Sequence, residues 1–221
     1  MDLEREKRLA AQAAAAIVQE GMIVGLGTGT TVACLLPAIA ARGLGIRCVA
    51  TSPHTEQLAR ELGLPVEPFG GVDRFDIAID GADQIAPDGW LVKGGGAAHT
   101  REKVVAASAD RFVVIADSSK PVERVHAPVP LELLEYGVAS TLRRLGRIGP
   151  VRRRDGTARS PDGGVICDYV GEVEDPAALA EALRAVPGVV EHGLFEPGLV
   201  SAVVVGRGDG VDWLTRRPGR G

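Results

Sequence analysis

Short apolar runs alternate with longer helical segments along the first 120 residues, and this alternation restricts the fold more than any other feature of the sequence. A strand reaches a parallel neighbour only through a long crossover, which is usually a helix. Alternating strands and helices therefore build β-α-β units, with helices covering both faces of one sheet. The pattern predicts a doubly wound, mostly parallel α/β sheet of the Rossmann-like type, with strands at residues 22–24, 46–50, 75–79 and 112–116.

Helix signals fill the gaps between these strands. Ser52 is a favourable N-cap and Pro53 suits the first helical position that follows it. Pro37 lacks the N–H that a helix interior needs, so it is expected to bend or end the second helix. The predicted helices span residues 2–20, the stretch up to 39, 53–62 and 100–109.

From about residue 128 the order of elements changes to strand, helix, strand, strand, helix, strand. This order is the β-α-β-β-α-β pattern of a ferredoxin-like α+β domain. A last strand at 200–205 and the segment after it are expected to return to the first domain. We therefore predict a Rossmann-like catalytic domain formed by residues 1–127 plus 206–221, and a smaller ferredoxin-like domain formed by residues 128–205.

Composition excludes several classes of function. Apolar residues make up 45% of the chain and charged residues 24%, an ordinary balance for a soluble domain. The net charge of −4 disfavours nucleic-acid binding, which needs a basic surface. No apolar run approaches the roughly 20 residues that span a bilayer, and no secretory leader is recognised. We expect no nucleic-acid partner, no membrane contact and a cytoplasmic location.

The three cysteines and four histidines do not form a metal-binding pattern. Cys34, Cys48 and Cys167 lie far apart in apolar segments and are predicted to be small buried residues of a reducing compartment. We therefore expect no disulfide and no metal site. A basic cluster between Arg143 and Arg154 is interpreted mainly as a solvated surface, with a patch for an anionic partner as the alternative.

Three polar clusters each follow directly after a predicted strand, at residues 28–31, 80–83 and 117–120. Ligands of such sheets bind beyond the carboxyl ends of the strands, so all three clusters are expected to meet at one crevice. The run Gly25-x-Gly27-Thr28-Gly29-Thr30-Thr31 offers backbone amides, hydroxyls and a helix N-terminus to an anion such as a phosphate. A plain tight turn is the alternative. The run fits the dinucleotide fingerprint poorly, and no Walker lysine follows it.

Two further clusters suggest acid–base chemistry on a small ligand. Asp80 and Asp83 flank Gly81-Ala82 and could hold hydroxyl groups or act as acid and base, although a capped turn is equally compatible with them. Lys93 precedes three consecutive glycines, whose entropic cost is hard to explain in an ordinary loop. Lys93 could stabilise an oxyanion, and Glu102 follows on the next helix, where an exposed charge is the alternative. Lys120 and, less strongly, Lys7 suit a phosphate; a surface lysine is the commoner interpretation of Lys7.

Taken together, these residues resemble the ribose-5-phosphate isomerase A family. The matching blocks occur in order and span nearly the whole chain, and the KGGGAA-x-TREK run with DGAD upstream is a highly specific pair. The blocks are GLGTGTT at 25–31, IDGADQI at 79–85, LVKGGGAAHTREK at 91–103, ADSSK at 116–120, PGVVEHGLF at 187–195 and DGV at 209–211.

The resemblance implies an aldose–ketose isomerase of the pentose phosphate pathway that acts on a small sugar phosphate, without metal or cofactor, as a homodimer or homotetramer. It implies that Glu102 moves a proton between C1 and C2 through an enediolate. Lys93 and the amides of Gly94, Gly95 and Gly96 are then expected to stabilise the oxyanion. The remaining residues implied to bind substrate are Lys7, Thr28, Gly29, Thr30, Thr31, Asp80, Gly81, Ala82, Asp83 and Lys120.

The sequence departs from the family pattern at four places, one of which is the stretch Phe195-Glu196-Pro197-Gly198, which lacks the acidic residue often found shortly after it. Gln84 stands where an acidic residue is common, His99 replaces an apolar residue, and Pro37 interrupts the second helix. A sugar-phosphate-sensing regulatory domain of the same fold is the main alternative, but it would not need the Lys93 and Glu102 pair. A coenzyme A transferase relative and a nicotinamide enzyme are weaker alternatives.

Overall fold

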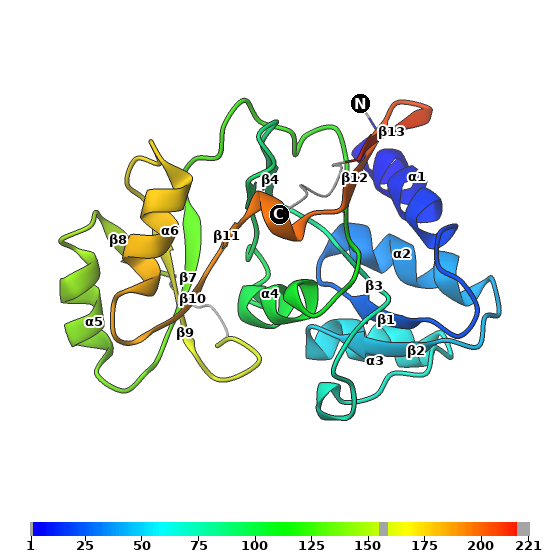
Figure 1. Ribbon diagram of the computed structural model, residues 1–221, viewed down its shortest axis with the longest axis horizontal. Coiled ribbons are helices and arrows are strands. Elements are labelled where there is room, and N and C mark those ends of the chain that lie inside the picture. Colours follow the sequence, from blue (N-terminus) through cyan, green and yellow to red (C-terminus); the bar gives the residue numbers. More distant parts are fainter. Residues whose placement is uncertain (1, 155–158, 216–221) are drawn as a thin grey trace. The chain divides into compact units, whose positions relative to one another are not determined.

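The computed structural model describes residues 2–154 and 159–215, and these residues form two compact units. One unit runs from the N-terminus to Ala82, from Arg101 to Lys120 and from Gly198 onward. The second comprises Asp83–Thr100 and Pro121–Pro197. Figure 1 labels most of the helices and strands of both units. None of the described helices is long and apolar enough to cross a membrane.

The first unit is built on a sheet with the strand order β13-β12-β6-β3-β1-β2. Neighbouring strands from β12 to β2 are parallel, and only β13 pairs antiparallel, with β12. This is the doubly wound sheet that the alternating pattern predicts. The strands are β1 (Ile23–Leu26), β2 (Arg47–Ala50), β3 (Ile77–Asp80), β6 (Phe112–Ala116), β12 (Ala202–Arg207) and β13 (Gly210–Thr215).

Helices cover both faces of this sheet. Alternate side chains of β1 and β3 point toward one face, where they pack with α1 and α2 in one apolar core. Gly25 and Ala78 point to the other face, where α4 packs: a Cβ on Gly25 would lie 2.4 Å from Val105 Cγ1. The helices of this unit are α1 (Leu3–Ala15), α2 (Thr30–Ala40), α3 (Pro53–Glu61) and most of α4 (His99–Ala107), with a 3₁₀ turn η1 (Phe69–Gly71).

Two helix predictions need correction. α2 does not end early at Pro37: it continues to Ala40, and the N–H of Ala41 donates to the Pro37 carbonyl. A buried helix face holds the last turn in place despite the lost hydrogen bond. The α-helical part of α1 ends at Ala15 instead of the predicted residue 20, and the Arg42 guanidinium donates to the carbonyls of Ala15 and Val18 at and just beyond this end.

The second unit contains an antiparallel sheet with the strand order β10-β7-β9-β8. Counted along the chain this is fourth, first, third, second, the arrangement of a ferredoxin-like domain. Helices α5 (Val138–Leu145) and α6 (Pro176–Arg184) bury Leu145 and Leu183 in the core of this unit. The strands are β7 (Val129–Leu133), β8 (Val151–Arg153), β9 (Val165–Tyr169) and β10 (Val189–His192).

A small three-stranded sheet, β11-β5-β4, completes the second unit, together with the 3₁₀ turn η2 (Pro197–Leu199) at the point where the chain leaves it. Its strands are β4 (Gln84–Ile85), β5 (Leu91–Val92) and β11 (Leu194–Phe195). The unit boundaries lie elsewhere than at the predicted residues 127/128 and 205/206. Residues 83–100 pack with the second unit because β5 pairs with β11, and β12 lies in the first unit because it pairs with β6. Residues 155–158 and 216–221 lie outside the described residues.

The cysteines are free, as the sequence predicts. Cys48 and Cys167 are buried, and Cys34 is half-buried. Burial raises the pKa of the Cys48 thiol to about 12, so this side chain is a neutral member of the core.

One buried carboxylate joins three parts of the first unit. Glu6 of α1 accepts hydrogen bonds from the N–H of Ser118 (2.9 Å) and the N–H of Gly208 (2.8 Å). Hydrogen bonding from the Ser118 side chain, and then from the Gly208 and Ser118 amides, lowers the pKa of Glu6 to about 2. α1 also lies directly against β12, since a Cβ on Gly206 would come within 2.1 Å of the Glu6 carbonyl oxygen. The loop after β6 is therefore tied to α1.

The lowered pKa of Glu6 predicts a pH-dependent contribution to stability. The folded-state pKa of about 2 lies below the ordinary value of 4.5, so the contribution is complete above pH 4.5 and is lost as pH falls toward 2. We expect Glu6→Gln to lower the free energy of unfolding at pH 7, and we expect the difference from the wild type to shrink by pH 3. Urea unfolding at several pH values measures this difference in the free energy of unfolding. Glu174→Gln, at an exposed position, is the control. A difference that is independent of pH would contradict the assignment.

Candidate active site

Three neighbouring parallel strands bring three loops to one edge of the first unit. β1 pairs with β3 and β3 pairs with β6, all in the same direction. Their carboxyl ends therefore lie at the same edge, and the loops that leave them are residues 27–29, 81–82 and 117–120. In open α/β sheets this edge is where ligands bind.

The loop between β1 and α2 is shaped to receive an anion. Gly29 is the N-cap of α2, with a φ of 113° that favours glycine, and it has no side chain to cover the first N–H groups of the helix. Thr28 is half-buried, Thr30 is exposed and Thr31 is buried. The unpaired amides at a helix N-terminus, the positive end of its dipole and nearby hydroxyls together suit a phosphate.

Asp80 supports this loop from the end of β3. Its Oδ1 accepts hydrogen bonds from the N–H of Thr28 (2.9 Å) and from its neighbour Gly81 (2.7 Å). The side chain is buried, with 3% of its surface exposed. A Cβ on Gly27 would lie 1.9 Å from the same Oδ1, so the loop approaches the carboxylate as closely as a glycine permits. Asp80 therefore holds the loop as well as facing the ligand edge.

Two threonines that were not predicted from the sequence stabilise the loop through hydrogen bonds. Thr51 Oγ1 lies 2.8 Å from Thr28 Oγ1, and the hydroxyl of Thr55 donates to the Gly27 carbonyl at 2.8 Å. Both residues are buried. The only sequence signal for these two residues was their position on either side of the Ser52 N-cap. Hydroxyl residues are common at the start of a helix, so this signal did not indicate a role at a binding site.

Glu102 lies on the side of α4 that faces the sheet. α4 follows β4 and β5 in the crossover from β3 to its parallel neighbour β6 and leads directly into β6, so it runs back against the strands and its first turn lies near their carboxyl edge. Val105, one turn further on, packs against Gly25 of β1. Residues three apart share a helix face, and Glu102 is 4% exposed. The exposed charge that its sequence context suggests is therefore the wrong interpretation.

The two candidate phosphate lysines differ in their surroundings. Lys120 is half-buried at the end of the loop after β6, and its N–H donates to the Asp117 carbonyl at 3.3 Å. Asp117 Oδ1 also accepts hydrogen bonds from the N–H of Ser119, at 2.9 Å, and from its hydroxyl. Lys7 forms a 2.6 Å ion pair with the exposed Glu4, an interaction of little energetic weight.

The second unit holds the triglycine run. Lys93 is 2% exposed, and its Nζ lies 5.3 Å from the centre of the Phe195 ring. The N–H of Gly95 donates to Asp83 Oδ2 at 2.8 Å. Gly94 has a φ of 105°, and a Cβ there would meet the His99 ring and Pro130 at less than 3 Å. Lys93, Gly94, Gly95 and Asp83 are thus brought together within one unit.

The structure explains two departures from the family pattern. Gln84 Oε1 accepts from the N–H of His126 (2.8 Å) and its Nε2 donates to the His126 carbonyl (2.9 Å), so the amide pairs with both backbone groups. A carboxylate could not donate to that carbonyl. His99 is fully buried against Gly94, where its ring occupies the space that the missing Cβ leaves.

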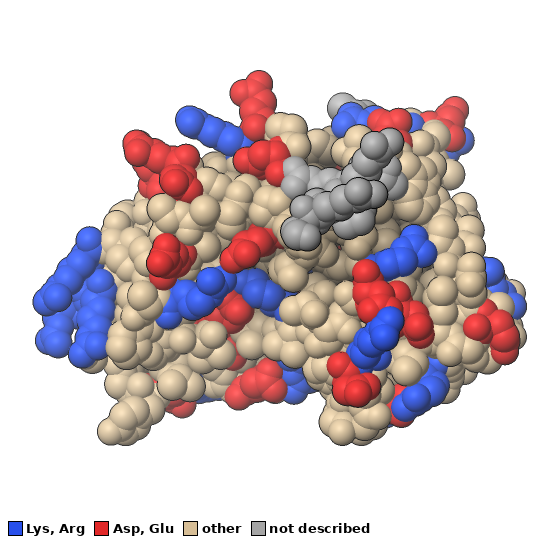
Figure 2. Space-filling model, viewed as in Figure 1, with Lys and Arg blue, Asp and Glu red and all other residues tan. Residues whose placement is uncertain are grey.

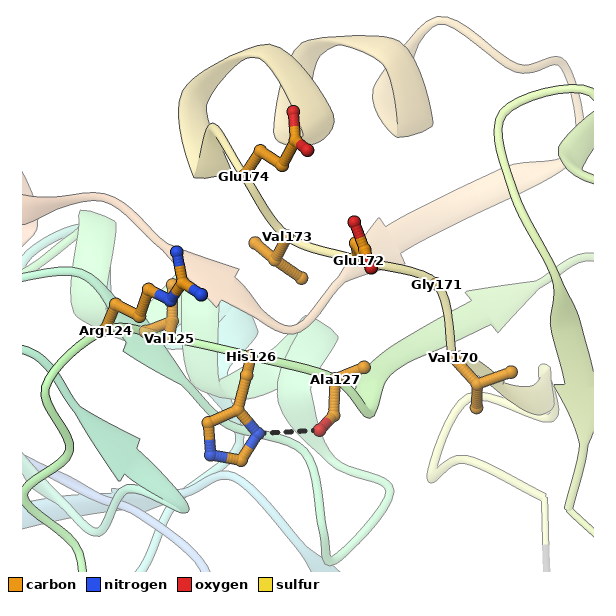
Figure 3. A pocket seen from close by; sticks show the side chains of 9 residues that line it. All are labelled: Arg124, Val125, His126, Ala127, Val170, Gly171, Glu172, Val173 and Glu174. Atoms are coloured by element: carbon orange, nitrogen blue, oxygen red, sulfur yellow. Dashed lines mark hydrogen bonds between the residues drawn. The ribbon is translucent and has the colours of Figure 1, made fainter.

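A pocket of about 400 Å³ lies elsewhere in the second unit, between segments 124–127 and 170–174. Figure 3 shows these segments, with His126 Nδ1 beside the Ala127 carbonyl at 2.8 Å. No residue predicted for the site lines it. Within residues 2–154 and 159–215 there is also no group of three or more His, Cys, Asp and Glu side chains that could hold a metal ion.

The basic cluster separates into exposed and half-buried members. Figure 2 shows Lys and Arg side chains gathered over α5, where Arg143, Arg144 and Arg147 are exposed. Arg153 is exposed as well, whereas Arg154 is half-buried and bound to other residues of the second unit.

Comparisons with known proteins agree on one family. A family model described as ribose 5-phosphate isomerase A (phosphoriboisomerase A) matches residues 47–210. Ribose-5-phosphate isomerase A of Natronomonas pharaonis is 45% identical over 219 residues, which cover 95% of this chain and 96% of that protein. The protein of the same name from Halobacterium salinarum is 47% identical over 216 residues, which cover 94% of each chain.

Solved structures agree over the whole chain. A D-ribose-5-phosphate isomerase in complex with phospho-erythronic acid superposes with a TM-score of 0.91 at 32% identity and covers 98% of this chain and 100% of its own. Ribose 5-phosphate isomerase from Plasmodium falciparum has a TM-score of 0.87 at 31% identity, covering 96% and 98%. The fold and these relatives thus define an enzyme of the isomerase class. The chain belongs to the ribose 5-phosphate isomerase A family.

The contact between Gly27 and Asp80 predicts the effect of a single methyl group. Gly27→Ala must displace the Asp80 carboxylate, so we expect a loss of about 1–3 kcal/mol in the free energy of unfolding and a higher KM for a phosphorylated substrate. Denaturant unfolding and steady-state kinetics measure the two effects. Gly70→Ala is the control, because a Cβ there meets nothing within 4 Å. Equal behaviour of the two variants would show that Asp80 does not hold the loop.

Proposed function

We propose that the enzyme interconverts D-ribose 5-phosphate and D-ribulose 5-phosphate through an enediolate, with Glu102 as the general base and without a metal ion. The observation that carries this proposal is the burial of Glu102 on the first turns of α4, at the edge that also bears the glycine–threonine loop. A sugar-phosphate-sensing domain would have no use for a buried carboxylate at this position.

The chemistry requires one base and a stabilised oxyanion. In the open-chain aldose, Glu102 removes the proton from C2, which lies next to the C1 carbonyl, and an enediolate forms. Return of that proton to C1 gives the ketose, while the hydroxyl proton moves from O2 to O1. One positioned carboxylate can carry out both transfers, because the proton that it takes from C2 is the proton that it returns to C1.

We assign the stabilisation of the enediolate oxygens to Lys93 and the Gly94–Gly96 amides. A buried ammonium group and preorganised N–H donors act most strongly where water is excluded, and Lys93 is 2% exposed. Asp80 and Asp83 are assigned to the sugar hydroxyls. Each already accepts a backbone N–H with one carboxylate oxygen, which fixes its orientation.

The phosphate end is assigned to the N-terminus of α2, with Thr28, Gly29, Thr30 and Thr31, and to Lys120. Binding far from the reacting carbons contributes orientation without taking part in proton transfer. Lys7 has a weaker claim, because its Nζ is paired with Glu4.

We further propose a cytoplasmic homodimer or homotetramer that acts in the non-oxidative branch of the pentose phosphate pathway. Free, largely buried cysteines fit a reducing compartment. The family membership supports the oligomeric state and the pathway.

Glu102→Gln tests the base directly. The amide keeps the size of the side chain but cannot accept the proton, so we expect kcat to fall about 10²–10⁴-fold with KM changed only a few-fold. Ribose 5-phosphate isomerisation is measured with excess chelator, and Glu61→Gln at an exposed position is the control. Near-normal turnover in the Glu102 variant would refute its role, and loss of wild-type activity on chelation would refute the metal-free mechanism.

Lys120→Ala tests the phosphate site. A hydrogen bond to a charged group contributes about 1.5–3 kcal/mol, so we expect KM to rise about 10–100-fold while kcat changes little. Arg124→Ala removes an exposed positive charge and serves as the control. An unchanged KM in the Lys120 variant would exclude a phosphate contact.

A further inference from the structure

The side chain of Arg154 is held rigidly although it lies in a basic run that looks like solvated surface. It follows β8, and its Nε and Nη2 donate to the two carboxylate oxygens of Asp168 at 2.8 and 2.6 Å. The side chains of Arg154 and Asp168 are 18% and 7% exposed. A two-point pair of this kind fixes the plane of the guanidinium group.

The third nitrogen of the same group binds the triglycine run. Arg154 Nη1 donates to the carbonyl oxygens of Gly94 at 3.1 Å and Gly95 at 3.2 Å. One cation therefore holds two successive peptide units of a segment whose residues have no side chains. Glycine backbone loses more freedom on ordering than any other residue, so this segment depends on external contacts for its conformation.

The direction of the carbonyls sets the direction of the amides. In a planar trans peptide the C=O of one residue and the N–H of the next point to opposite sides. With the carbonyls of Gly94 and Gly95 directed at Arg154, the N–H groups of Gly95 and Gly96 point away from it. The Gly95 N–H confirms this, since it donates to Asp83 Oδ2 at 2.8 Å. A cation on the carbonyl also polarises the peptide and strengthens its N–H as a donor.

We propose that Arg154, oriented by Asp168, is a positioning residue that holds the Gly95 amide on Asp83 and aims the Gly96 amide at the developing oxyanion of the substrate. The inference rests on the proposed isomerase reaction. Arg154 itself contacts neither the substrate nor the reacting atoms. It acts through the glycine backbone, and Asp168 acts through Arg154.

A residue that only stabilises the fold would affect stability and leave the kinetics of the folded protein unchanged. A positioning residue lowers kcat, because the amide that it aims binds the enediolate more strongly than the ground state. Loss of a residue that orients a metal ligand typically costs about 10–100-fold in activity, and we take the same range for a residue that orients an oxyanion donor. We expect this loss in kcat for Arg154→Ala, with KM changed less than about three-fold.

The variants are Arg154→Ala, Arg154→Lys and Asp168→Asn, with Arg153→Ala as the matched control on the neighbouring exposed arginine. Lysine keeps the charge but not the fork, so Arg154→Lys should resemble the alanine variant. Added guanidinium at millimolar concentration should restore part of the kcat of Arg154→Ala and leave Arg153→Ala unchanged. Should Arg154→Ala fail to fold, the lysine and Asp168 variants provide the same comparison.

Two ligands separate oxyanion recognition from phosphate recognition. Phospho-erythronic acid carries a carboxylate where the enediolate develops charge, and erythritol phosphate has a neutral CH₂OH group in its place. We expect Arg154→Ala to weaken binding of the acid about 10-fold or more and to leave binding of the alcohol within about two-fold. Equal weakening of both ligands, or a wild-type kcat in a folded Arg154→Ala, would overturn the proposal.

Failure of the Arg154 proposal can be distinguished from failure of the proposed isomerase function. If the wild type and Arg153→Ala do not isomerise ribose 5-phosphate, the proposed function is wrong, whatever Arg154 does. Amide hydrogen exchange of Gly95 and Gly96 tests the clamp independently of activity: it should accelerate at least about 10-fold in Arg154→Ala. Unchanged exchange would show that Arg154 does not order the run.

Discussion

The carboxylate of Asp80 is the contact on which the ligand edge of the first unit depends. It stands at the end of β3 and binds the N–H of Thr28, across the sheet on the loop after β1. This interaction requires glycine at position 27, where any side chain would overlap the carboxylate. One buried carboxylate thus sets the shape of the loop, and the N–H groups of Thr28 and Gly81 both donate to it. The loop after β1 and the end of β3 share this support.

Glycines mark the places where another part of the chain approaches the backbone closely. Gly25 admits Val105 of α4, and Gly206 admits the backbone of α1 at Glu6. The triglycine run differs, because its freedom must be removed by contacts from Asp83 on one side and Arg154 on the other. The fold therefore uses glycine in two ways: as a spacer in packed layers and as exposed backbone that other residues orient.

Much of the architecture was predictable because it depends on local periodicity. The alternation of strands and helices predicted the parallel sheet, and the β-α-β-β-α-β order predicted the antiparallel sheet whose strands lie in the order β10-β7-β9-β8. Pro37 was misjudged because tertiary burial of α2 outweighs one missing hydrogen bond. The end of α1 was misplaced, and Arg42, far away in sequence, donates to the carbonyl at this end. The reason for Gln84 could not be read from the sequence, because its hydrogen-bond partner, His126, is distant in the chain.

The sequence by itself determined the order of the elements and the residue types of the site, because periodicity and motif spacing are local properties of the chain. It also placed Asp80, Lys93 and Glu102 in recognisable blocks. Only the tertiary structure decided which charges are buried and what they bind. Glu102 and Arg154 both lie in charged runs that are typical of an exposed surface. Glu102 is nevertheless buried on the sheet-facing side of α4, and Arg154 donates hydrogen bonds to Gly94 and Gly95. Such partners lie some 60 positions apart in the chain, and no local pattern encodes a pairing across that separation.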